Sequence, residues 1–458
     1  MNRRRFMQTA AAMLVVTTTV AVAAAEKGHE HARPNIIFIL ADDLGYADLG
    51  CYGQKRIATP NIDRLAAEGM RFTQCYAGAP SCAPSRCVLM TGLHTGHATV
   101  RGNRGQNAPR HEGEANRVPL NADEVTVATL LKRAGYATGI TGKWGLGEPG
   151  SSGLPNDHGF DEWFGYLNQS NAHDYYPDYL WRNRDRQVIE ANRGGERAAY
   201  SADLFSEFAL DFIRKKQASP FFLYVATTIP HKNFEVPELG SYADESWPDQ
   251  AKAYGAMVTR MDTHVGKMLD LLKELNLDRK TIVFFTSDNG SAEAWQGVFD
   301  SCGPLRDKKF SLYEGGLRSP MIVRWPGKVP AGSVSETVWY FADFLPTAAA
   351  LANTTVPNAV DGIDVTATLL DNSKKLPDRF LYWELPGGDS QPLRQAIRWK
   401  QWKAVRHDPK AELELFHLPS DIGEAHNVSA GHPEVVARVL DFLKTARTPS
   451  PFWPTQVD

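Results

Sequence analysis

The stretch Pro34-Asn35-Ile36-Ile37-Phe38-Ile39-Leu40-Ala41-Asp42-Asp43 decides the fold of this chain. Its nearly continuous apolar run is typical of a central strand in a largely parallel sheet that is covered on both faces. Three more runs of this kind follow, at residues 136–140, 221–225 and 281–285. Helical patterns separate the four runs, at residues 60–69, 125–135, 201–216 and 251–275. Alternating strands and helices predict an α/β fold with a mixed, largely parallel sheet between helices.

The pattern changes after about Asp371. Short apolar segments follow at close spacing, which predicts an antiparallel sheet, and they are 380–384, 395–398, 402–405 and 413–416. The amphipathic segment 433–447 predicts a closing helix. We therefore expect a catalytic α/β domain over residues 33–371 and a smaller C-terminal α+β subdomain over residues 372–458.

Residues 1–25 have the pattern of an export signal. A basic segment, Asn2-Arg3-Arg4-Arg5, precedes an uncharged run from Thr9 to Ala25 that ends in small residues. Paired arginines in this position indicate the twin-arginine route. A membrane anchor is the alternative, but the run is short and interrupted by polar residues. We expect cleavage and a periplasmic or secreted protein without stable membrane insertion.

The composition is that of an ordinary globular protein. The chain has 458 residues, of which 43% are hydrophobic and 22% charged, with a formal net charge of −3. This charge gives no signal for nucleic-acid binding, so any anion must be recognised locally. Five cysteines are too few for a disulfide scaffold, and their odd number leaves at least one unpaired.

Polar residues follow each of the four apolar runs. Asp42 and Asp43 follow the first, Lys143 the second, His231 the third, and Asp288-Asn289 the fourth. A lone aspartate after a strand is more often a turn residue or a helix cap. In open α/β sheets, however, ligands bind outside the carboxyl ends of the strands. Four coincidences of this kind predict that these residues converge on one site.

The acidic members of this set predict a metal site. Three carboxylates packed together repel one another unless a cation neutralises them. The residues offer only hard oxygen donors, which bind calcium or magnesium rather than zinc, and they are Asp42, Asp43, Asp288 and Asn289. Calcium is our prediction, with magnesium as the alternative.

A second motif centres on Cys82, in Ser81-Cys82-Ala83-Pro84-Ser85-Arg86-Cys87. Pro84 suits the first turn of a helix, which would place Cys82 at the helix N-terminus. The helix dipole there favours anionic groups, and Arg86 adds a fixed positive charge. A buried structural cysteine is the simpler alternative.

Taken together, these motifs resemble the type I, formylglycine-dependent sulfatases, an arylsulfatase-like family. The resemblance runs from about Arg33 to the C-terminal helix. Besides the cysteine signature and the strand-end acids, it rests on Thr59-Pro60-Asn61-Ile62-Asp63, Gly142-Lys143-Trp144, Ser287-Asp288-Asn289-Gly290, and Lys309 before Tyr313-Glu314-Gly315-Gly316. It implies an alkaline-phosphatase-like fold and hydrolysis of sulfate monoesters, with sulfated carbohydrate as the substrate class.

The resemblance also implies roles for single residues. Cys82 would be oxidised to Cα-formylglycine by a formylglycine-generating enzyme, and Arg86 would hold the hydrated gem-diol, whose hydroxyl attacks sulfur beside the metal. Lys143 and Lys309 would bind the sulfate oxygens. His231 would protonate the leaving alcohol. The implied calcium ligands are Asp42, Asp43, modified Cys82, Asp288 and Asn289.

The sequence departs from the family pattern at Gly145. Many sulfatases carry a histidine two residues after this lysine, which is thought to help release sulfate. His173 is our candidate substitute, or a residue that reads the substrate, although a structural loop histidine is equally compatible. Arg101 is a second candidate substrate contact, although a residue of a solvated loop is an equally compatible interpretation. The segment Gly142-Lys143-Trp144-Gly145, together with the later His173-Asp174-Tyr175-Tyr176-Pro177, resembles a branch of bacterial polysaccharide sulfatases.

Two other functions fit parts of the pattern. A formylglycine-dependent phosphoester or phosphonate hydrolase would use a similar metal site and nucleophile. A non-catalytic glycan-binding protein could keep the fold, but it would be expected to lose the nucleophile, the metal acids or the lysines. All of these are present, so a sulfatase is the prediction.

Overall fold

Strand β1 (Asn35–Ala41) lies in the middle of an eleven-stranded mixed sheet. The computed structural model describes residues 33–105, 108, 117–357, 359–387, 392–455 and 457, and residues 33–458 form one compact unit. The predicted export signal lies outside the described residues. Across the sheet the strands are β10 (Ser333–Ser335), β2 (Met70–Tyr76), β9 (Arg318–Arg324), β8 (Thr281–Ser287), β1, β7 (Phe221–Ala226), β3 (Ala137–Lys143), β4 (Glu162–Tyr166), β5 (Tyr179–Arg182) and β6 (Asp185–Val188); β11 (Trp339–Tyr340) also pairs with β2.

The central strands are parallel and in close register. β8, β1, β7, β3 and β4 run in one direction, and Leu40 of β1 lies opposite Ala226 of β7 and Thr286 of β8. β9 is antiparallel to β8 and β2, and β5 is antiparallel to β4 and β6. The predicted mixed, largely parallel sheet is confirmed. Because the register is aligned, the residues that follow these strands meet at one edge.

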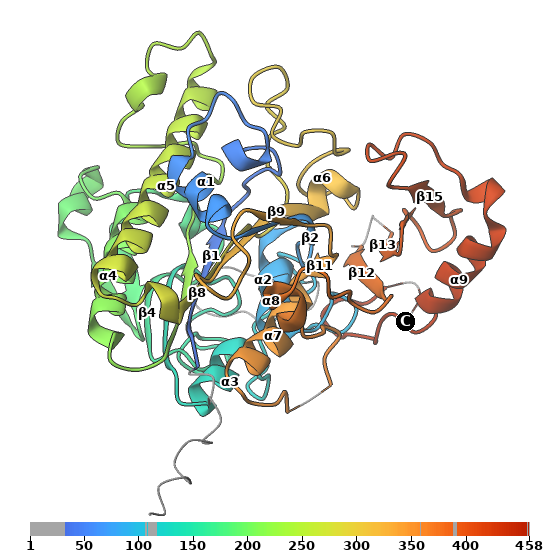
Figure 1. Cartoon of the computed structure of the whole chain (residues 1–458), viewed down its shortest axis with the longest axis horizontal. Helices are drawn as coiled ribbons and strands as arrows, with labels where there is room; N and C mark the ends of the chain where they lie inside the picture. The colour runs from blue at the N-terminus through green and yellow to red at the C-terminus, as the bar shows by residue number, and fades with distance from the viewer. Residues whose placement is uncertain are drawn as a thin grey trace, which may run out of the picture. The chain divides into compact units, whose positions relative to one another are not determined.

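Helices cover both faces of the sheet (Figure 1). Alternate side chains of β1 point to opposite faces, since successive residues of a strand do so. Ile37 and Ile39 belong to the core beneath α1 (Pro60–Ala67), α4 (Ser201–Lys216) and α5 (Asp249–Glu274). Phe38 belongs to the core beneath α2 (Cys82–Thr91), α3 (Val127–Arg133) and α7 (Phe344–Leu351). No helix in the described part of the chain is long and apolar enough to cross a membrane.

The C-terminal region forms a separate antiparallel sheet. Its strands are β12 (Phe380–Leu385), β13 (Arg394–Trp399), β14 (Trp402–Arg406) and β15 (Glu414–His417). Helix α9 (Pro433–Leu443) packs on this sheet through a core that includes Ile397, Leu415 and Val439. The helix ends before the predicted residue 447, because the chain turns so that Thr448 N–H donates to Gly96 O at 3.0 Å. That tertiary contact overrides the helical pattern.

A buried ionic network ties this sheet to the short helix α6 (Glu314–Leu317). Lys403 Nζ of β14 lies 3.0 Å from Glu314 Oε1 and 3.4 Å from Glu424 Oε1, and all three side chains are 0% exposed. Glu424 also accepts the Glu314 backbone N–H at 2.7 Å. Buried charges of this kind remain favourable only while every partner is present.

We predict that Lys403→Met lowers the free energy of unfolding by about 3–5 kcal/mol, because it removes the ion-pair partner of buried Glu424 and leaves buried Glu314 paired with Arg318. Urea unfolding of the whole chain measures this. Lys444→Met is the matched control, since Lys444 pairs with Asp441 at the surface of the same C-terminal region and this pair should contribute less than about 1 kcal/mol. Equal losses in the two variants would contradict the prediction.

Candidate active site

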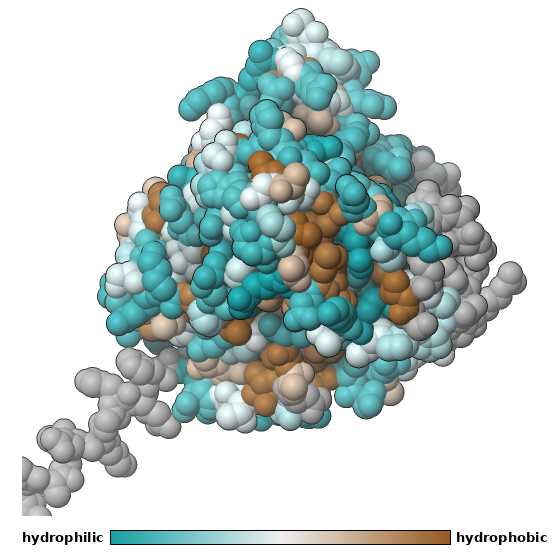
Figure 2. All heavy atoms as spheres, turned by 90° about the vertical axis from the view of Figure 1, so that its right-hand side faces the viewer, coloured by the Kyte–Doolittle hydropathy of each residue, from teal (hydrophilic) through white to brown (hydrophobic). Residues whose placement is uncertain are grey.

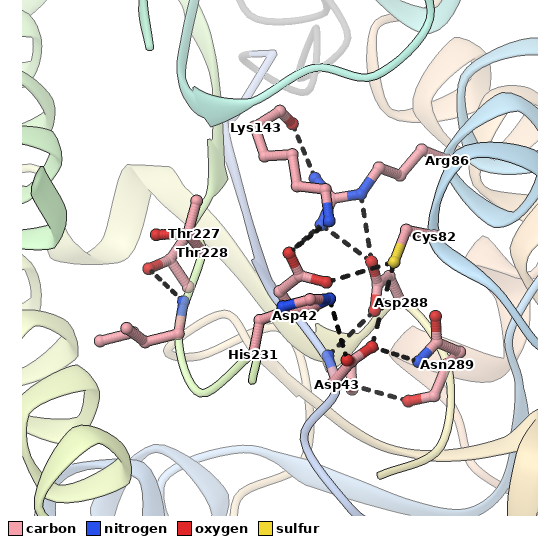
Figure 3. A network of polar contacts seen from close by, with 12 residues as sticks. Asp42, Asp43, Cys82, Arg86, Lys143, Thr227, Thr228, His231, Asp288 and Asn289 are labelled. Atoms are coloured by element: carbon pink, nitrogen blue, oxygen red, sulfur yellow. Dashed lines mark hydrogen bonds and ion pairs between the residues drawn. The ribbon is translucent and has the colours of Figure 1, made fainter. Parts of the chain in front are cut away.

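The polar residues that follow the central strands meet in one buried cluster (Figure 3). Asp42 and Asp43 leave β1, Lys143 ends β3, and Asp288-Asn289 leave β8. His231 follows β7 and lies 3% exposed beside them. Cys82 and Arg86 enter from α2, and Lys309 from the segment before α6. The structure thus brings together all of the residues predicted for catalysis and metal binding.

Two lysines neutralise the acids that follow β1. Lys143 Nζ lies 2.7 Å from Asp42 Oδ2, and Lys309 Nζ lies 2.7 Å from Asp43 Oδ2. Burial raises the pKa of both carboxyls, but the neighbouring ammonium groups outweigh it and hold both pKa values below the ordinary range. Asp42 and Asp43 are therefore ionised at neutral pH.

The third acid is less well compensated. Arg86 donates to one oxygen of Asp288, from Nε at 3.1 Å and from Nη2 at 2.8 Å. Burial, followed by the charge of Asp42, raises the pKa of Asp288 to about 7. An added cation would therefore stabilise its ionised form.

Asn289 completes a set of oxygen donors. Its Nδ2 donates to Asp43 Oδ1 at 2.7 Å, whereas its buried Oδ1 has no partner among the described residues. Buried amide oxygens are rarely left without a partner. An unpartnered oxygen beside three carboxylates fits a hard divalent cation, which takes oxygen ligands. Asp42 and Asp43 also belong, with Cys82 and His231, to a group whose potential ligand atoms lie within 4.8 Å of one another.

Cys82 lies at the centre of this cluster as the first residue of α2. Its Sγ lies 3.4 Å from Asp42 Oδ1 and 3.3 Å from Lys309 Nζ, and the residue is 2% exposed. Burial raises the pKa of the thiol to about 12, although Lys143 and Lys309 lower it. The unmodified side chain is thus a neutral thiol and a poor nucleophile at neutral pH.

His231 lies where it could exchange a proton with a group bound at Cys82. Its Nε2 lies 3.3 Å from both Lys309 Nζ and Asp43 Oδ2. The turn that carries it is held by Tyr175, whose hydroxyl donates to Thr228 O at 3.0 Å and His231 O at 2.8 Å. Burial lowers the pKa of His231, against the pull of Asp43.

Comparison with known proteins assigns this arrangement to a family. The family model described as Sulfatase matches residues 34–354, and the model described as N-sulphoglucosamine sulphohydrolase, C-terminal, matches residues 304–447. The chain belongs to the sulfatase family. It is therefore a sulfuric ester hydrolase, as the motifs predicted.

Individual relatives agree with this assignment. The sulfatase is 37% identical to the N-acetylgalactosamine-6-sulfatase of Homo sapiens over 462 residues, which cover 90% of this chain and 85% of the relative. It also matches the crystal structure of Ps i-CgsB in complex with k-i-k-neocarrahexaose, with a TM-score of 0.79 and 31% identity over 92% of this chain and 95% of that one. The predicted alkaline-phosphatase-like fold is thereby confirmed.

One neighbour bears on the predicted alternative. The phosphonate monoester hydrolase of Agrobacterium radiobacter aligns with a TM-score of 0.67 but only 21% identity, over 90% of this chain and 95% of that one. This similarity shows a shared fold alone. It does not change the assignment to the sulfatases, which rests on the family model over residues 34–354.

The two candidate substrate contacts lie in different places. The ring of His173 stacks on that of His231, with centroids 4.3 Å apart, so this residue borders the sulfatase site. Arg101 lies instead in the seam with the C-terminal region, where Nη1 approaches Glu384 Oε1 at 3.5 Å and donates to Thr448 O at 2.9 Å. Its side chain is 3% exposed, and its hydrogen bonds and ion pair within the described residues are to Ala98, Glu384 and Thr448 rather than to Cys82.

The space beside Gly145 is filled by Gln169, a residue that belongs to none of the sequence motifs. A Cβ at Gly145 would lie 2.0 Å from Gln169 Nε2, and Gly145 has a φ of +79°. Gln169 is 5% exposed, and its Nε2 has no partner among the described residues. Its amide therefore takes the place of a side chain at position 145. The unusual glycine at position 145 is the one sequence signal for this packing of Gln169, because Gln169 is 24 positions further along the chain.

None of the five cysteines, all of which lie in the described part of the chain, forms a disulfide. Cys75 and Cys87 are fully buried, and Cys302 is 7% exposed. The unpaired cysteine that the odd count required is thus one of five free thiols, and Cys82 is distinguished from the others by its neighbours.

We predict that Gly145→Ala destabilises the sulfatase by about 1–3 kcal/mol more than Gly150→Ala, because the new Cβ displaces the buried Gln169 amide. Gly150 is a matched control, since its φ of +80° is nearly the same and a Cβ there meets nothing within 4 Å. Thermal unfolding measures both variants. The extra cost should vanish when Gln169→Ala is added, and similar losses in both single variants would contradict the prediction.

Proposed function

We propose that this sulfatase hydrolyses sulfate monoesters of carbohydrates and that its nucleophile is a formylglycine made from Cys82. The contacts of Cys82 carry the proposal, since its Sγ lies 3.4 Å from an ionised carboxylate and 3.3 Å from Lys309 Nζ. A buried neutral thiol serves poorly there, whereas a hydrated aldehyde supplies one hydroxyl to attack and a second to release the product. The carbohydrate class is supported by the relatives, which include N-acetylgalactosamine-6-sulfatases and a structure with a bound neocarrahexaose.

A calcium ion is proposed to share the site, with magnesium as the less favoured alternative. The proposed protein ligands are Asp42, Asp43, modified Cys82, Asp288 and Asn289. The raised pKa of Asp288 and the unpartnered Asn289 oxygen support this assignment. When bound, a divalent cation supplies Lewis-acid chemistry and offsets the negative charge of the acids.

The basic residues have distinct proposed roles. Lys143 and Lys309 stabilise the oxygens of the sulfate group, which gain charge in the transition state. Arg86 fixes Asp288 through two N–H groups and holds the modified residue 82 one helical turn away. His231 gives its Nε2 proton to the leaving sugar oxygen. His173 lies against its ring and either orients it or replaces the histidine absent at position 145.

The sequence supports a proposal for maturation and location. We infer that residues 1–25 direct export, and that a formylglycine-generating enzyme acts on Cys82 before the twin-arginine route carries the folded protein out. Residues 33–371 would form the catalytic domain and residues 372–458 the subdomain that completes it. The periplasm or the exterior of the cell would then be the place of action.

Mass spectrometry of the Cys82 peptide tests the nucleophile. We predict a loss of about 18 Da relative to cysteine after production with a formylglycine-generating enzyme, since one sulfur and two hydrogens are exchanged for one aldehyde oxygen. Cys82→Ala should abolish hydrolysis, whereas Cys87→Ala, its neighbour in α2, should retain it. Unmodified Cys82 in an active preparation would sink the mechanism. Faster turnover of a phosphate ester than of the matching sulfate ester would favour the phosphoester alternative.

Removal of divalent ions tests the metal. We predict that dialysis against a chelator lowers both the Tm and the sulfatase activity and that calcium restores both, because an ion bound only to the native state at 100 times its Kd adds about 2.7 kcal/mol of stability. Asn289→Leu should need more calcium for the same gain in Tm. If calcium leaves the Tm of the chelated protein unchanged, the site is not a calcium site, and stronger recovery with magnesium would reassign it.

A further inference from the structure

Phe310, which follows Lys309 directly, is 55% exposed. The other exposed large apolar residues in the described part of the chain are between 39% and 46% exposed, and they are Val188, Val334, Leu370, Leu440 and Val457. None of those is aromatic. On the face turned to the viewer in Figure 2, apolar residues gather in separate patches among hydrophilic ones. Single exposed apolar residues are normal on protein surfaces. A role for Phe310 therefore has to be argued from its position and its backbone conformation.

The backbone of Phe310 is strained. Its φ is +68°, in the left-handed region that bulky residues avoid. Among non-glycine residues with positive φ in the described part of the chain, the only aromatic ones are Trp295 and Phe310. Trp295 gains packing in return, since its ring contacts Phe234, Tyr254 and Phe299. No ring–ring contact involves Phe310 within the described residues. Backbone strain that no packing contact offsets is found mainly at functional positions.

Two backbone hydrogen bonds fix this conformation between the two halves of the site. Phe310 N–H donates to Pro80 O at 2.8 Å, two residues before Cys82. Lys309 N–H donates to Ser291 O at 3.0 Å, two residues after Asn289. The strained residue is thus held by the segment that carries the nucleophile and by the loop that carries the proposed metal ligands.

The ring lies at the boundary between the site and solvent. Its centroid is 5.3 Å from Lys309 Nζ, which itself lies 3.3 Å from Cys82 Sγ. One side of the ring therefore approaches the buried cation, while more than half of the residue remains exposed. An exposed aromatic ring thus lies beside Lys309, a residue proposed to bind the sulfate oxygens.

We propose that Phe310 is the stacking platform for the sugar ring whose sulfate is removed, an inference that rests on the carbohydrate substrate class proposed above. A pyranose ring presents an apolar face of C–H groups, and the negative face of an aromatic ring attracts such groups. The lysines hold the sulfate and Phe310 holds the sugar to which it is attached. Trp144 and Trp163, which are 1% and 0% exposed, are unavailable for this contact.

The competing explanation is that the ring only shields Lys309. A shield would pack against its neighbours, whereas Phe310 is 55% exposed. At φ +68° a glycine would also relieve the strain. The two explanations therefore differ in what glycine does to stability and to substrate binding.

The test compares Phe310→Ala, Phe310→Gly and Phe310→Tyr with Val334→Ala, which shortens a side chain that is 46% exposed on β10. The probes are N-acetylgalactosamine 6-sulfate and a sulfated carrageenan oligosaccharide, and inorganic sulfate serves as a competitive inhibitor. We expect the alanine and glycine variants to raise KM for the saccharide about tenfold, the effect of one lost aromatic contact. The tyrosine and Val334 variants should retain the wild-type KM. The inhibition constant of sulfate should not change, and the Tm of the glycine variant should equal or exceed that of the wild type.

An unchanged KM in Phe310→Ala, with the wild type active on the saccharide, would overturn the platform and leave the proposed function intact. A lower Tm in Phe310→Gly, together with weaker inhibition by sulfate, would identify the ring as structural support and also overturn it. If the wild type hydrolyses an aryl sulfate but neither saccharide, the carbohydrate substrate class fails and the platform fails with it.

Discussion

The charge balance around Cys82 is the constraint on which the rest of the structure depends. Three carboxylates, each at most 1% exposed, face two lysines and an arginine, with contacts as short as 2.7 Å. Each ion alone would cost several kcal/mol to bury, and only the complete set offsets that cost. The partners therefore have to be delivered together. Since the partners come from β1, β3, β8, α2 and the segment before α6, the site forms only when the sheet, the helix and that segment are all in place.

The aligned register of the parallel strands places most of these charged residues at the same edge of the sheet. Two close approaches of the backbone complete this arrangement, and both require glycine. A Cβ at Gly142, the residue before Lys143, would lie 1.9 Å from Ala226 O of the neighbouring strand. A Cβ at Gly290, the residue after Asn289, would lie 1.8 Å from Gly315 O. Glycine at these two positions thus allows the backbone next to Lys143 and Asn289 to approach the adjacent segments more closely than any other residue type would allow.

The sequence predicted the parts of the site that carry local signals. Apolar runs mark β1, β3, β7 and β8, and the residues after them had to meet once the strands were parallel. Cys82 could be placed because Pro84 and Arg86 sit in the same helical turn. Other features depend on contacts between residues of ordinary type far apart in the chain. Gln169 fills the space beside Gly145, and Arg101 pairs with Glu384 in a seam that no periodicity reveals. The strain at Phe310 is a backbone property, set by hydrogen bonds to Pro80 and Ser291 and invisible in its residue type.

The C-terminal sheet also contributes to the positioning of the site residues, through its buried contacts with α6. Lys403 is buried against Glu314 and Glu424, so it fixes the start of α6. Within α6, Gly316 O accepts the N–H of Gly290 at 3.1 Å, directly after the proposed metal ligand Asn289. A displacement of the sheet would move α6, and α6 would move the loop that carries Asp288 and Asn289. The antiparallel sheet is therefore linked to the loop that carries Asp288 and Asn289 through α6, in agreement with the grouping of residues 33–458 in one compact unit.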